Sequence, residues 1–146
     1  MDIFVDADAC PVKEIIVGLA KKYNKKVYMF LDVSHSYEDG YSTVLTFDKG
    51  ADSVDFAIVN RIKENDVCVT QDYGLATMIL AKKAYAVHQN GFEYNSSNID
   101  QMLFERHIGK ELRRAGKHGT KHKRRSKENN ENFHSFFDNF LATHQF

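Results

Sequence analysis

The feature that most constrains this chain is an apolar segment near its start that leads directly into two acidic residues. Residues 3–5 (Ile-Phe-Val) favour a β-strand, and Asp6 and Asp8 follow them. Pro11 then comes where a helix can begin. After it, apolar residues recur at the spacing of one buried helix face: Val12, Ile15, Ile16, Leu19, Ala20 and Tyr23. A strand therefore passes into a helix, with two carboxylates at the junction.

Asp6 and Asp8 have two explanations at such a junction. Aspartate is a favoured helix cap, because its side chain accepts hydrogen bonds from the first N–H groups of the helix. A cap uses one side chain, however, and two like charges this close repel each other unless a cation or a proton lies between them. The carboxyl ends of strands in an open α/β sheet are also where ligands bind. We therefore expect at least one of the two to hold a metal ion or to take part in catalysis.

The rest of the chain alternates apolar strands with amphipathic helices. We expect further strands at residues 27–31, 43–47, 67–70 and 84–87. We expect further helices at residues 54–62 and 75–82, a helix capped by Asn98, and a last helix capped by Ser126. The aromatic stripe of the last helix indicates a core-facing surface. The pattern predicts an α/β fold: a three-layer sandwich around a mainly parallel sheet of four or five strands, with a C-terminal helical extension.

Length and composition fit one ordinary globular domain over residues 1–146, with 42% hydrophobic and 27% charged residues. The formal net charge of zero hides a division into three parts. Residues 1–105 form an acidic α/β core, residues 106–127 hold half of the 20 Lys and Arg residues, and residues 128–146 form the aromatic helix. The basic segment indicates a nucleic-acid partner or, equally, a solvated connector.

The chain shows neither a secretory signal nor an apolar run of the roughly 18 residues that a membrane span needs. We therefore expect a cytoplasmic protein with no membrane partner. Cys10 and Cys68 have no metal-ligand spacing and are expected to be small buried residues.

Acidic residues follow strands or begin helices at three separate places: Asp6 and Asp8, then Asp52 and Asp55, then Asp72. The carboxyl ends of parallel strands lie at one edge of a sheet, so these side chains should meet in one cleft. Several unpaired carboxylates repel strongly, and Mg²⁺ or Mn²⁺ is their natural neutralising cation. The sequence thus predicts a cation site of Asp6, Asp8, Asp52, Asp55 and Asp72.

Three segments resemble the YaiI/YqxD family of bacterial proteins: residues 5–12, 49–59 and 69–76. The resemblance continues to the aromatic helix and implies a PIN-like topology, because this family is similar to PIN-domain nucleases. It implies catalytic roles for Asp6, Asp52, Asp55 and Asp72. One departure is Gln89-Asn90-Gly91, where relatives usually have Pro-Arg-Gly, so that an arginine able to contact phosphate is absent.

The favoured function is metal-dependent cleavage of phosphodiester bonds in RNA. The basic segment would attract the RNA backbone through Arg113, Arg114, Lys121, Lys123, Arg124 and Arg125. One alternative is a haloacid-dehalogenase-like phosphatase with Asp6 as nucleophile, Asp8 as acid/base and Lys49 as its lysine. Another is a non-catalytic nucleic-acid-binding or interaction module.

Overall fold

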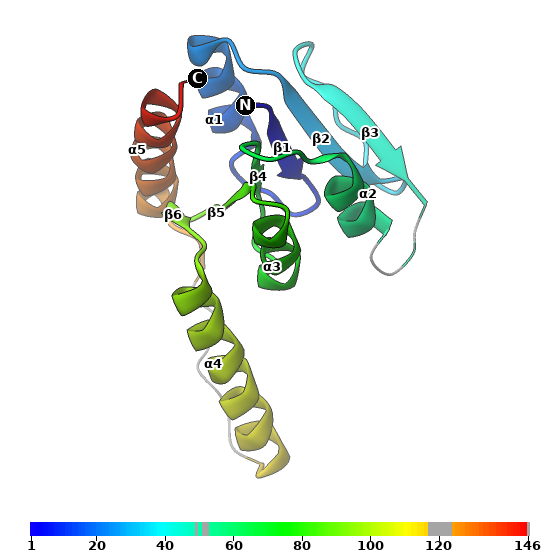
Figure 1. Cartoon of the computed structure of the whole chain (residues 1–146). Coiled ribbons are helices and arrows are strands. Elements are labelled where there is room, and N and C mark those ends of the chain that lie inside the picture. Colours follow the sequence, from blue (N-terminus) through cyan, green and yellow to red (C-terminus); the bar gives the residue numbers. More distant parts are fainter. Residues whose placement is uncertain (49, 51–52, 117–123, 146) are drawn as a thin grey trace.

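The computed structural model describes residues 1–48, 50, 53–116 and 124–145 (Figure 1). Strands and helices alternate over most of the chain, as the sequence pattern predicts. In chain order the elements are β1 (Ile3–Asp6), α1 (Lys13–Tyr23), β2 (Val27–Asp32), β3 (Thr43–Phe47), α2 (Ser53–Arg61), β4 (Val67–Val69), α3 (Tyr73–Ala81), β5 (Tyr85–His88), β6 (Phe92–Glu93), α4 (Ser96–Arg114) and α5 (Lys127–Thr143).

The sheet has the strand order β3-β2-β1-β4-β5-β6. All neighbouring strands are parallel except β5 and β6, which are antiparallel. The expectation of four or five strands was therefore one short, because β6 has only two residues and leaves no periodicity to detect. The order reverses between β1 and β4, which creates a crevice at the carboxyl ends of these two strands.

Helices cover both faces of the sheet and give the predicted three layers, an arrangement consistent with a PIN-like topology. Figure 1 shows α1 and α5 on one face and α2 and α3 on the other. Side chains of β1 alternate between the two cores: Ile3 and Val5 pack with α1 and α5, whereas Phe4 packs with α2 and α3. Cys10 and Cys68 are buried free thiols, as expected.

Helix α5 docks through the predicted aromatic stripe, since Phe133, Phe137, Phe140 and Leu141 are buried. Ser126 caps the helix as expected, by accepting a hydrogen bond from the Asn129 N–H. The turn between β5 and β6 lies against the same helix. A Cβ atom on Gly91, whose φ is +92°, would lie 2.7 Å from the backbone oxygen of Asn132.

Helix α4 extends away from the sheet in Figure 1, and most of its residues are exposed. It begins earlier than predicted: Asn95 is the N-cap, and Asn98 is the third helical residue. The two asparagines form a reciprocal capping box, so Asn98 also accepts a hydrogen bond from the Asn95 N–H. Within the described residues, no helix is both long enough and apolar enough to cross a membrane.

A candidate metal centre at the carboxyl ends of the strands

A cavity of about 350 Å³ lies at the carboxyl edge of the sheet, where the order of the strands reverses. Its walls come from the ends of β1 and β2, the residues that follow β1, β3 and β4, and the start of α2, as the convergence argument predicts. Ten described residues line it: Asp6, Asp8, Asp32, Asp48, Gly50, Ser53, Val54, Asp55, Gln71 and Asp72. Four of the five acids predicted to meet therefore do share one cavity. The fifth, Asp52, lies outside the described residues.

Asp6 is the last residue of β1 and is partly buried. Its Oδ2 accepts a hydrogen bond of 2.8 Å from the Thr70 hydroxyl. Desolvation by burial, which is the largest cause, and the negative charges of Asp55, Asp72 and Asp8 together raise the pKa of Asp6 to about 6, against the lowering effect of that hydrogen bond. A bound cation would remove the part of the shift that comes from these charges.

Asp72 is held by the start of α3. It is the N-cap residue, and its Oδ1 accepts hydrogen bonds from the N–H groups of Gly74 and Leu75. Its own N–H donates to Oγ1 of Thr70, the hydroxyl that also donates to Asp6. Thr70 therefore ties the two acids together across the crevice between β1 and β4. Asp72 therefore caps α3 and also lines the cavity, so both explanations of this acid hold.

Asp8 lies in the turn after β1 and contacts the end of β2. Its Oδ2 accepts a 3.1 Å hydrogen bond from the Asp32 N–H. Its Oδ1 is buried and accepts no hydrogen bond within the described structure, although Nδ1 of His35 lies 2.8 Å from it. The contact between His35 and this oxygen lacks the geometry of a hydrogen bond, and it is an ion pair only when the imidazole is protonated. A buried carboxylate oxygen without a donor is costly, and a cation would satisfy it.

Asp32 and His35 were not predicted as site residues. Asp32 ends β2 and lines the cavity, and His35 follows in the next turn, 3.3 Å from the Asp32 Oδ1. The Ser34 hydroxyl and the Ser34 N–H, together with the nearby His35, lower the pKa of Asp32. A signal was present in the sequence, since β2, like β1, is an apolar run that ends in aspartate.

The donor set of the cavity fits a hard divalent cation. Six carboxylates line it among the described residues, and no lysine or arginine does. Carboxylate oxygen is the ligand that Mg²⁺ and Mn²⁺ prefer, and the raised pKa of Asp6 indicates charge that lacks compensation. Asp6, Asp8, Asp55 and Asp72 are the residues that would hold such an ion.

Comparison with known proteins places the chain among close relatives. The family described as "Uncharacterized BCR, YaiI/YqxD family" matches residues 4–143. The chain belongs to the YaiI/YqxD family. A UPF0178 protein of Ruminiclostridium cellulolyticum is 54% identical over 133 residues, which cover 91% of this chain and 87% of the relative. A UPF0178 protein of Lachnoclostridium phytofermentans is 49% identical over 146 residues, covering 98% of each. No solved structure matches this member of the family.

The described basic residues predicted to bind nucleic acid do not line the cavity. Arg113 and Arg114 are exposed in the last turn of α4, at the end farthest from the sheet in Figure 1. Arg124 is also exposed. Lys121 and Lys123 lie outside the described residues.

Arg125 differs from the other predicted basic residues because its side chain is anchored. Its Nε donates to Oδ1 of Asn130, and Nη2 donates to the backbone oxygen of Gln89, both at 2.8 Å. Its Nη1 donates to Oδ1 of Asn90. The guanidinium thus joins the start of α5 to the turn between β5 and β6.

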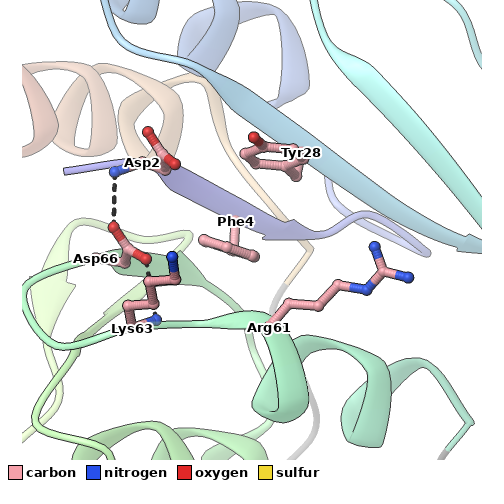
Figure 2. Close-up of a pocket in the computed structure, with 6 residues that line it drawn as sticks. All are labelled: Asp2, Phe4, Tyr28, Arg61, Lys63 and Asp66. Carbon is pink, nitrogen blue, oxygen red and sulfur yellow. Dashed lines mark hydrogen bonds between the residues drawn. The ribbon is translucent and has the colours of Figure 1, made fainter.

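A second pocket, of about 290 Å³, lies at the opposite, amino-terminal edge of the sheet. Figure 2 shows its six lining side chains: Asp2, Phe4, Tyr28, Arg61, Lys63 and Asp66. Asp66 is 8% exposed, and its carboxylate accepts hydrogen bonds from the N–H groups of Asp2 and Lys63, at 2.9 and 3.0 Å. Because two backbone donors satisfy this carboxylate, Asp66 fastens the starts of β1 and β4, and the pocket offers no matched donor set for a cation.

Proposed function

We propose that this protein is a divalent-metal-dependent phosphodiesterase that cleaves RNA. The observation that carries the proposal is the meeting of Asp6, Asp55 and Asp72 from separate parts of the chain in one cavity at the switch point of the sheet. Capping explains each acid alone, but it does not explain why all of them share a cavity lined by no described lysine or arginine.

In this proposal Mg²⁺ or Mn²⁺, when bound, supplies a Lewis acid for the phosphate and an activated water molecule. The protein supplies position. The Thr70 hydroxyl fixes one oxygen of Asp6, and the first N–H groups of α3 fix one oxygen of Asp72. The proposal assigns the second oxygen of each carboxylate to the cation, with Asp8 and Asp55 completing its surroundings.

The phosphatase alternative is less favoured. A covalent mechanism with Asp6 as nucleophile also requires a lysine close to the acids, and the described residues that line the cavity include none. Lys49, the candidate for that role, lies outside the described residues. Metal-dependent hydrolysis needs only carboxylates at this place, which is what the cavity offers.

The test of metal binding is a thermal unfolding series with Mn²⁺ and Mg²⁺. Wild type should unfold at a higher temperature as the metal concentration rises, because an ion that binds only the folded cluster stabilises it by mass action. Asp6→Asn and Asp72→Asn should remove this gain while keeping the side-chain oxygen that accepts the hydrogen bonds. Asp100→Asn, which changes the same charge on exposed α4, should keep it.

The test of activity uses a fluorophore-labelled single-stranded RNA with the same four proteins. We expect cleavage that requires added metal, is lost in Asp6→Asn and Asp72→Asn, and persists in Asp100→Asn. If the wild-type protein binds both metal and RNA but does not cleave the RNA, the protein is the non-catalytic nucleic-acid-binding module instead. If added metal does not stabilise the wild-type protein, the acids are helix caps or solvated charges and do not hold a cation.

A further inference from the structure

Three side chains of metal-ligand type meet at the rim of the cavity, and one of them is a histidine. The atoms are Oδ1 of Asp8, a carboxylate oxygen of Asp32 and a ring nitrogen of His35, all within 4.8 Å of one another. Nδ1 of His35 lies 2.8 Å from Oδ1 of Asp8 and 3.3 Å from Oδ1 of Asp32. Two ligand atoms on one ion, each at about 2.1 Å and at angles of 90–109°, lie about 3.0–3.4 Å apart. The observed spacing is close to that range.

Backbone contacts hold these three residues in place. The Asp32 N–H donates to Oδ2 of Asp8, at 3.1 Å, and the His35 N–H donates to the Asp32 backbone oxygen, also at 3.1 Å. The Ser34 N–H donates to Oδ1 of Asp32, at 2.8 Å. The turn after β2 therefore presents its aspartate and histidine to the turn after β1 before any ligand arrives, which lowers the ordering cost of binding.

Oδ1 of Asp8 is an independent indication of a ligand. It is buried and accepts no hydrogen bond from the described residues, while its sister oxygen is satisfied by Asp32. The nearest polar atom is the ring nitrogen of His35, which faces a second carboxylate as well. Two carboxylates and one imidazole thus converge on one point, and a cation at that point would contact all three.

We propose that Asp8, Asp32 and His35 form a binding site for a transition-metal ion of the Mn²⁺, Co²⁺ or Zn²⁺ class. Imidazole nitrogen favours these ions, whereas Mg²⁺ favours oxygen ligands alone. The site lies beside the Asp6, Asp55 and Asp72 cluster and shares Asp8 with it, and Asp32 also lines the cavity. Three protein ligands leave coordination positions for water or a substrate oxygen, as in open metal sites. His35 is half-exposed, so the ion reaches the site from solvent.

The experiment uses Co²⁺ as the probe with the full chain. Co²⁺ is titrated into wild type, His35→Ala and His35→Gln, and binding is followed by calorimetry and by the visible absorption of the bound ion. His107→Ala is the matched control, because His107 is an exposed histidine on α4. Wild type and His107→Ala should bind Co²⁺ with the same affinity. Both His35 variants should bind it at least about tenfold more weakly, since even the loss of a group that only orients a ligand costs that much.

Mg²⁺ separates this proposal from the proposed function. The Mg²⁺-dependent rise in unfolding temperature should be unchanged in His35→Ala and lost in Asp6→Asn. Equal Co²⁺ affinity in wild type and His35→Ala would overturn the transition-metal site and leave His35 as an ion-pair partner, whatever the RNA assay shows. A loss of Mg²⁺ stabilisation in His35→Ala would overturn the separation of the two sites.

Discussion

The two ends of the central sheet carry a buried aspartate, Asp66, and a partly buried one, Asp6, and the two side chains have opposite surroundings. At the amino-terminal end, Asp66 accepts two backbone hydrogen bonds (Figure 2). At the carboxyl end, Asp6 accepts one hydrogen bond from a hydroxyl and faces three other acids. Burial alone therefore does not distinguish a structural acid from a functional one. What distinguishes them is whether the fold itself supplies the donors that the negative charge needs.

Asp66→Ala should have the largest effect on stability. The substitution removes two partly buried hydrogen bonds from the N–H groups of Asp2 and Lys63 to a carboxylate, which we expect to lower the free energy of unfolding by about 4 kcal/mol. Urea unfolding followed by circular dichroism measures this, and Asp100→Ala on exposed α4 is the control. A loss below about 0.5 kcal/mol would break the comparison, because Asp66 would then not be a structural acid.

Asp6→Asn should leave the metal-free protein as stable as wild type or more stable at neutral pH. The pKa of Asp6 is about 6 in the folded protein, above its ordinary value of 3.8, so the folded state binds the proton more tightly. Without metal, the stability that Asp6 contributes is therefore highest below pH 3.8 and falls as the pH rises to about 6. Relative to Asp6→Asn, wild type should lose about 3 kcal/mol across this window.

The measurement is urea unfolding between pH 4 and pH 7 in the presence of a chelator. In Asp100→Asn, the free energy of unfolding should depend on pH as it does in wild type. If Asp6→Asn is instead less stable than wild type at neutral pH, Asp6 is a structural acid like Asp66, and the contrast between the two ends of the sheet disappears.

The junction between β1 and α1 shows how far the sequence predicts this molecule. An apolar run, two acids and a helix-compatible proline were enough to place Asp6 and Asp8 at a strand end. The parallel arrangement then followed from the alternation of elements. Convergence of Asp55 and Asp72 on the same cavity was predicted for the same reason, because parallel strands present their carboxyl ends at one edge.

Asp32 and His35 show where this reasoning ends. The apolar run before Asp32 was a signal for that residue alone, whereas the polar segment after it indicated only a loop. The place of His35 beside the cavity depends on the register of β2 against β1, which pairs Phe30 with Asp6. Register is set by packing on both faces of the sheet and is not visible in one strand alone. Arg125 was grouped with the other basic residues for the same reason. Its partners, Gln89 and Asn90, are more than 30 residues away along the chain.

Arg125→Ala extends the comparison to positive charge. All three guanidinium nitrogen atoms of Arg125 donate hydrogen bonds, to Asn130, Gln89 and Asn90. Like Asp66, Arg125 is thus a charged side chain whose partners the fold itself supplies. We expect the substitution to lower the free energy of unfolding by about 2 kcal/mol, since it removes bonds between α5 and the turn that α5 packs against. Arg124→Ala is the matched control and should change stability by less than about 0.5 kcal/mol. Equal effects in thermal unfolding would show that Arg125 is not a structural clamp.

Arg124→Ala should have the smallest effect on stability and a measurable effect on RNA binding. Exposed arginines bind phosphate without reading sequence, and each contact that is lost should flatten the dependence of the logarithm of affinity on the logarithm of salt concentration by about 0.7 for single strands. Fluorescence anisotropy with a labelled single-stranded RNA at several salt concentrations gives this slope.

Arg113→Ala should reduce this slope by a similar amount, and Asp100→Asn should not. Because Arg113 and Arg114 lie at the far end of α4 from the cavity, Mn²⁺ stabilisation should remain unchanged in these variants. An unchanged slope in both arginine variants would mean that exposed charge on this segment is solvated and has no RNA partner.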